Sequence, residues 1–82
     1  MLGVKDKGIL LQIIKRCNRV IEKVSNISET EFSLNDDIKE VVCFNLFQIG
    51  ELANGLSVEF IKEYNKIPWK QIIGMRNRIV HG

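Results

Sequence analysis

The chain has few of the side chains that bind metals, because its 82 residues include only two cysteines and one histidine. This set does not supply the usual four ligands of a structural zinc site, so we expect no metal and no other cofactor. Cys17 falls on an apolar helical stripe, and we interpret it as a reduced thiol. No apolar run approaches the roughly 18 residues of a membrane span, and no signal peptide is visible. These absences predict a cytoplasmic protein without a membrane segment.

The charge is modest overall but unevenly distributed. The net charge is +2, with 45% apolar and 27% charged residues, which is typical of one globular domain over residues 1–82. Residues 1–25 carry six basic and two acidic side chains. Residues 26–60 carry one basic and seven acidic side chains, and residues 61–82 carry five basic and one acidic. This asymmetry suits either the steering of a polyanion or the pairing of basic outer helices with an acidic inner helix.

Apolar residues recur at the three- and four-residue spacing of helices along the whole chain. We expect a long helix at about 5–26, a loop over 26–33 and a second long helix ending at Asn54. A short helix through about Tyr64 and a final helix reaching the motif near residue 81 complete the pattern. The sequence thus predicts an all-α, up-and-down helical bundle with three main helices and a short one.

Polar residues, glycine and proline mark the ends of these helices. Ser33 or Asn35 is the expected cap of the second long helix, and Gly55 its left-handed stop. Ser57 is placed to cap the short helix, and Pro68 suits the first position of the final helix.

The final helix contains an arginine where packing alone predicts an apolar residue. At about 100° per residue, Arg76 lies near the middle of an apolar stripe. A guanidinium in such a stripe needs a partner or an interface. Asn77 and His81 are four residues apart and share an adjacent face with Lys70. A fixed cation, an amide and a titratable imidazole on one helix edge are suited to binding and transferring a phosphodiester. The stripe consists of Trp69, Ile72, Ile73, Ile79 and Val80.

The second long helix also interrupts its own apolar pattern. Asn45 lies inside its stripe, and Gln48 and Glu51 border it on one side. We expect Glu51 or Asn45 to hold Arg76, fixing the guanidinium for work at the surface. The alternative is that the same polar pairs merely satisfy each other inside a bundle.

Two glycines are expected to lie inside helices, at a cost of about 1 kcal/mol each relative to alanine. Close approach of neighbouring helices would account for both Gly50 and Gly74.

Several stretches together resemble the HEPN-domain proteins of the HepT type, the toxin half of HepT–MntA toxin–antitoxin systems. They follow the family order over nearly the whole chain, and Ile-Pro-Trp followed by Gly-Met-Arg-Asn and a histidine is the most specific part. The matching stretches are Asn45-Leu46, Ile49-Gly50-Glu51-Leu52, Ile67-Pro68-Trp69 and Gly74-Met75-Arg76-Asn77-Arg78-Ile79-Val80-His81.

The resemblance implies an all-helical bundle that dimerises and cleaves RNA without a metal ion, with the Arg-x4-His motifs of two subunits meeting in a cleft. Arg76, Asn77 and His81 match the active-site motif, and Lys70 and Arg78 are the expected RNA phosphate contacts. A second histidine from the dimer partner would let one imidazole act as base and the other as acid. The implied partners are RNA, a second copy of the chain and an MntA-type nucleotidyltransferase antitoxin.

The chain departs from the family pattern in two places. The family motif continues as His-x-Tyr, where the tyrosine accepts AMP from the antitoxin, whereas this chain stops at Gly82 and its only tyrosine is Tyr64. The family also has a further C-terminal helix. We therefore expect a truncated domain, with weak or no activity in the 82-residue form because a fraying helix end holds His81 poorly.

Two other interpretations stay open at this point. One is a catalytically inactive helical module that binds a nucleotidyltransferase and presents a segment to it. The other is a purely structural helical dimer.

Overall fold

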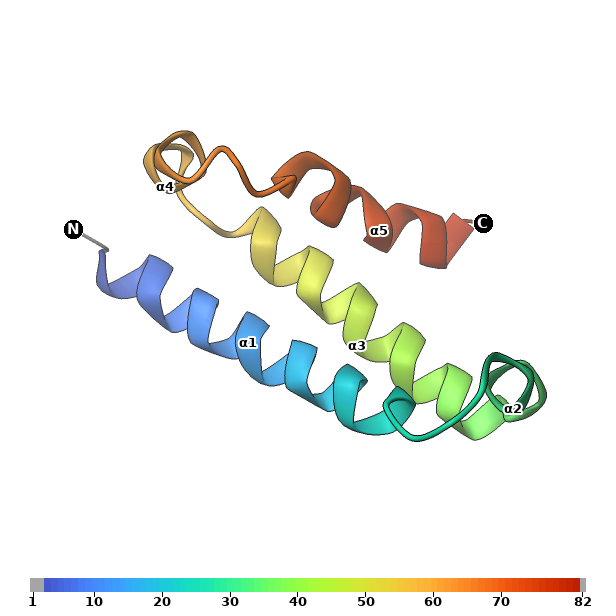
Figure 1. The fold of residues 1–82 in the computed structure, drawn as a ribbon. Coiled ribbons are helices and arrows are strands. Elements are labelled where there is room, and N and C mark those ends of the chain that lie inside the picture. The colour runs from blue at the N-terminus through green and yellow to red at the C-terminus, as the bar shows by residue number, and fades with distance from the viewer. Residues whose placement is uncertain (1–2, 82) are drawn as a thin grey trace.

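The computed structural model describes residues 3–81, with side chains as far as Ile79, and confirms the all-α prediction. Three long helices, α1 (Val4–Val24), α3 (Asp36–Asn54) and α5 (Trp69–His81), are joined through two short ones, α2 (Glu29–Leu34) and α4 (Val58–Glu63). The long helices run alternately up and down, and α3 lies between α1 and α5 (Figure 1). Every side chain on α3 is therefore close to one outer helix, to the other, or to the surface.

The core forms where α4 and the start of α5 close over one end of α1 and α3. Ala53 of α3 is fully buried, and Phe60 of α4 and Trp69 of α5 are each 5% exposed. The two aromatic rings lie 5.7 Å apart between centroids, in a tilted arrangement. The indole Nε1 of Trp69 donates to the carbonyl of Tyr64 at 3.1 Å, which fixes the start of α5. This end of the bundle thus sets the direction in which α5 runs along α3.

The predicted loop over 26–33 is wrong, because part of it is the helix α2. Ser28 and Glu31 form a capping box: the Glu31 N–H donates to Ser28 Oγ at 3.0 Å, and the Ser28 N–H donates to the Glu31 carboxylate at 3.5 Å. This Ser-x-x-Glu signal is visible in the sequence and predicts a helix start. Asn35, rather than Ser33, caps α3 by accepting from the Ile38 N–H.

Gly55 ends α3, but not through the predicted left-handed conformation. Its φ of −88° and ψ of −6° are right-handed values that any residue adopts. A Cβ at Gly55 would lie 3.3 Å from the carbonyl oxygen of Leu52 and 3.4 Å from the side chain of Ile9. An added side chain at this position would therefore contact both α3 and α1, with the shorter distance to the last turn of α3 itself.

Ser57 caps α4 as predicted, and it also ties α4 to the beginning of α1. Ser57 Oγ accepts from the Phe60 N–H at 3.1 Å and donates to the Asp6 carboxylate at 2.6 Å. The Ser57 N–H donates to the same carboxylate at 2.9 Å. The hydroxyl bond and then the backbone bond lower the pKa of Asp6, so the carboxylate stays ionised and anchors α1 at neutral pH.

None of the helices within residues 3–81 is long and apolar enough to cross a membrane.

Candidate active site between α3 and α5

Arg76 forms an ion pair with Glu51, one of the two partners that the sequence suggested. Its Nη1 lies 3.0 Å from the Glu51 Oε1, joining α5 to α3. The Arg76 side chain is 27% exposed and that of Glu51 is 46% exposed. The pair therefore lies at the surface end of the helix contact, where the guanidinium is oriented yet still reachable from solvent.

Gly50 brings the backbones of α3 and α5 together directly beside this ion pair. A Cβ at Gly50 would lie 3.1 Å from the carbonyl oxygen of Ile72, 3.2 Å from the Arg76 Cβ and 3.3 Å from the Arg76 nitrogen. These distances are tighter than most real Cβ contacts, so a larger residue here would require α3 and α5 to move apart by a few tenths of an ångström. The prediction of close approach is correct at Gly50. It is wrong at Gly74, where an added Cβ meets nothing within 4 Å.

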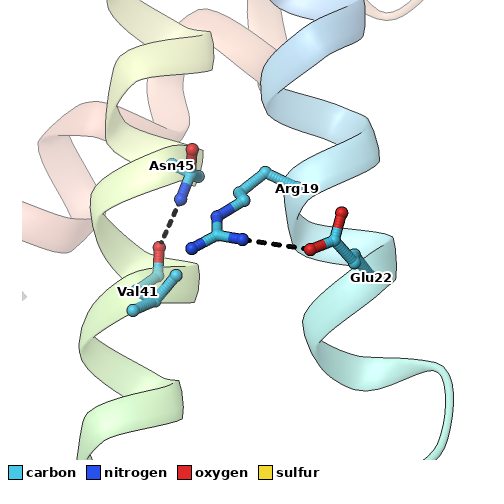
Figure 2. Close-up of polar contacts among 4 residues, drawn as sticks. All are labelled: Arg19, Glu22, Val41 and Asn45. Carbon is cyan, nitrogen blue, oxygen red and sulfur yellow. Dashed lines mark hydrogen bonds and ion pairs between the residues drawn. The ribbon is translucent and has the colours of Figure 1, made fainter.

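Asn45 does not hold Arg76, because its side chain points to the opposite side of α3, toward α1. Its Oδ1 accepts from Arg16 Nη1 at 3.2 Å, and its Nδ2 donates to the Val41 carbonyl at 2.7 Å. Figure 2 shows the Asn45–Val41 bond and the guanidinium of Arg19 extending from α1 toward α3. Asn45 is 3% exposed, so Arg16 and its own helix satisfy it in the interior.

Arg16 is not predicted as a site residue from the sequence, because it lies among the charged residues of the outer face of α1. A weak signal exists: Arg16 directly precedes Cys17, at the edge of the apolar stripe of α1. Only the register of α1 against α3 pairs this edge with Asn45.

The other predicted site residues lie along α5. Lys70, Asn77 and Arg78 are exposed on this helix. His81 lies in its last turn, about 7.5 Å beyond Arg76 along the axis at 1.5 Å per residue, but its side chain lies outside the described residues. The structure thus places Arg76, Asn77 and the backbone of His81 on one continuous helix, with Arg76 held from α3.

Comparisons with known proteins identify the family of the chain. Residues 11–82 match the HepT-like family, described as "Ribonuclease HepT-like". A protein of Caldanaerobacter subterraneus subsp. tengcongensis named a "putative RNase" is 35% identical over 72 residues, covering 88% of this chain and 64% of that protein. A Methanocaldococcus jannaschii protein with the same description is 33% identical over 75 residues, covering 92% of this chain and 69% of its own. No solved structure matched the chain.

These matches define a helical domain of the ribonuclease HepT-like class. The chain belongs to the HepT-like family, as its sequence motifs suggested. It spans about two thirds of the length of the two relatives described above.

Proposed function

We propose that the whole protein is a metal-independent endoribonuclease that acts through Arg76, Asn77 and His81, as the toxin of a toxin–antitoxin pair in the cytoplasm. The observation that carries this proposal is the Glu51–Arg76 ion pair beside the tight Gly50 contact. Together they hold a guanidinium at a partly exposed point, one turn and a half before the only histidine. Catalytic groups need this kind of support from neighbouring side chains and backbone.

The proposed reaction uses the 2′-hydroxyl of RNA as the nucleophile. An imidazole removes the proton from this hydroxyl, whose oxygen attacks the adjacent phosphorus while the bond to the 5′-oxygen of the next nucleotide breaks. A second imidazole protonates that leaving oxygen, giving a 2′,3′-cyclic phosphate and a 5′-hydroxyl. Arg76 donates to the phosphoryl oxygens, where negative charge develops, and Asn77 orients His81 or donates to phosphate. Lys70 and Arg78 are exposed along the same helix and are available to neighbouring phosphates.

One histidine per chain favours a homodimer with His81 from each copy at a shared cleft. Large apolar side chains that are exposed on this chain support an association, since burying them in an interface would stabilise the dimer. They include Ile21, Leu34 and Val58, at 59%, 80% and 63% exposure. An MntA-type nucleotidyltransferase is the proposed antitoxin partner.

Cleavage of a single-stranded RNA by the purified whole protein in EDTA tests the mechanism. We expect cleavage with 2′,3′-cyclic phosphate ends, identified by mass spectrometry, and its loss in His81→Ala with an unchanged helical circular dichroism signal. Lys7→Ala is the matched control, because Lys7 is exposed on α1 away from the proposed site. Cleavage that requires a divalent metal, or full activity in His81→Ala, would refute the mechanism. RNA binding without cleavage would instead favour an inactive module that presents itself to the nucleotidyltransferase.

A further inference from the structure

We propose that a groove between α1 and α3 binds an unpaired nucleotide of an RNA strand, with its base stacked on Phe44 and its phosphate beside Arg16 and Lys15. The inference rests on the proposed ribonuclease function for the identity of the strand. The α1–α3 groove has a volume of about 980 Å³. Its apolar lining includes Ile14, Val41 and Phe44, and its cations are Lys15, Arg16 and Arg19.

Phe44 provides an aromatic surface that is already paired with a cation. Its side chain lies on α3 and the residue is 53% exposed. The guanidinium carbon of Arg16 lies 5.4 Å from the centroid of the ring, within the range of a cation–π contact. Sites for single-stranded nucleic acids combine these elements: an aromatic ring that stacks on a base and a cation that contacts the backbone.

The arginine over this ring is held by a buried amide. Asn45 is 3% exposed. Its Oδ1 accepts a hydrogen bond from Arg16, and its Nδ2 donates to the Val41 carbonyl. An apolar residue at position 45 would fill the stripe of α3 without needing hydrogen-bond partners. The polar residue instead fixes a guanidinium above an exposed ring, which prepares the groove for an anionic, planar ligand.

The charges of the groove favour a phosphate. Arg19 is offset by Glu22, with 3.0 Å between Nη1 and Oε1 (Figure 2). Lys15 and Arg16 then face one further carboxylate in the lining, that of Glu40. An excess of positive charge therefore remains, and it lies on the α1 side of the groove.

The lining combines apolar surface with polar groups, which suits a base as well as a phosphate. Eight of the twelve lining residues are polar or charged, although apolar atoms make up the larger part of the groove surface. Gln12 and Asn18 add amides that can donate to and accept from the edge of an unstacked base.

The α1–α3 groove is separate from the Arg76 site. Asn45 precedes Glu51 by six residues, or about 9 Å along the axis of α3. Asn45 contacts α1, whereas Glu51 contacts α5, and these helices lie on two sides of α3 (Figure 1). Binding in the groove can therefore be measured without the proposed catalytic groups.

The test measures binding of a fluorescein-labelled eight-nucleotide uridine RNA to the whole protein carrying His81→Ala, so that cleavage does not interfere. Phe44→Leu removes the ring but keeps an apolar side chain, and we expect it to weaken binding about 5- to 100-fold, the loss of one base stack. Lys7→Ala removes one exposed charge from the same helix as Arg16, and we expect a change of at most about twofold. Equal affinities for Phe44→Leu and Lys7→Ala would overturn the inference.

Three further measurements identify the occupant. Photocrosslinking of a 4-thiouridine RNA to the parent protein should map to the peptide containing Phe44, and crosslinks confined to α5 would refute the groove. Sedimentation that shows Phe44→Leu dissociating a dimer, with RNA affinity unchanged, would assign the groove to a second copy. Uridine monophosphate binding as tightly as the oligomer would assign it to a free nucleotide. A protein that binds RNA through Phe44 but never cleaves it would refute only the proposed function.

Discussion

The two sides of α3 each hold an arginine from a neighbouring helix, but by different means. On the α5 side, Arg76 is paired with the carboxylate of Glu51 at 3.0 Å. On the α1 side, Arg16 is held by the amide of Asn45 at 3.2 Å and by the ring of Phe44. A carboxylate orients a guanidinium and offsets its charge, whereas an amide and a ring orient it and leave the charge in place. The contrast supports the two proposed roles, a fixed position beside the reacting phosphate for Arg76 and the holding of an RNA strand for Arg16.

The kinetics of RNA cleavage should separate the two sides most strongly. We expect Arg76→Ala to lower kcat by about 10²- to 10³-fold, because it removes donors from the developing charge. Phe44→Leu should act mainly by raising KM for RNA, by about 5-fold or more, because it removes binding that is common to substrate and transition state. Steady-state cleavage assays on the whole protein check both, with Lys7→Ala as the control. Equal losses of kcat in both variants would show that the two sides act as one site.

The packing of α5 on α3 gives the next largest expected effect. We expect Gly50→Ala to lower the free energy of unfolding by about 1–2 kcal/mol, because the cost of overpacking exceeds the gain in helix propensity. Gly74→Ala should raise the free energy of unfolding by up to about 1 kcal/mol, since its Cβ meets nothing within 4 Å. Urea unfolding measures both. Equal stabilisation by the two alanines would show that α5 lies further from α3 in solution.

The same comparison shows which parts of the site the sequence could predict. Arg76 stood out because a cation in an apolar stripe needs a partner, and Glu51 at the edge of the α3 stripe was an available anion. Asn45 was assigned to the wrong side of α3, because a polar residue in an apolar stripe does not indicate which neighbouring helix holds its partner. Its true partner, Arg16, depends on how α1 is shifted along α3, which is set by tertiary contacts such as Asp6 with Ser57.

The fold was predictable from helical periodicity, and the errors of the prediction lay in features that this periodicity does not report. The helix α2 spans only six residues, too few for apolar periodicity to appear, and its capping box was the usable signal. The start of α3 is capped by Asn35 rather than Ser33, and both residue types suit this position. Gly55 at the other end lies near Ile9 of α1, and such a contact between distant segments is not encoded in the residue types of either segment alone.

The smallest expected effect is the energetic coupling between Glu51 and Arg76. Both side chains are partly exposed, Glu51 at 46% and Arg76 at 27%. A double-mutant cycle with Glu51→Gln and Arg76→Met, measured by urea unfolding, should therefore give a coupling free energy of about 0.2–1 kcal/mol. The Arg19–Glu22 pair is the matched control, because its side chains are more exposed, at 48% and 68%. Its coupling free energy should not exceed that of Glu51 and Arg76.

Glu51→Gln should nevertheless reduce kcat for RNA cleavage far more than its small effect on stability suggests, because a neutral amide holds the guanidinium less firmly. The KM for RNA should change little, since Glu51 acts through Arg76 rather than on the substrate. Glu51→Asp tests the same point, because it keeps a carboxylate that can still reach Arg76. We expect Glu51→Asp to retain more of kcat than Glu51→Gln does. If Glu51 were only structural, the two variants would not differ in this way. A coupling of zero, together with unchanged kcat in Glu51→Gln, would remove Glu51 as the residue that positions Arg76 and leave the Gly50 contact as the only support of the site from α3.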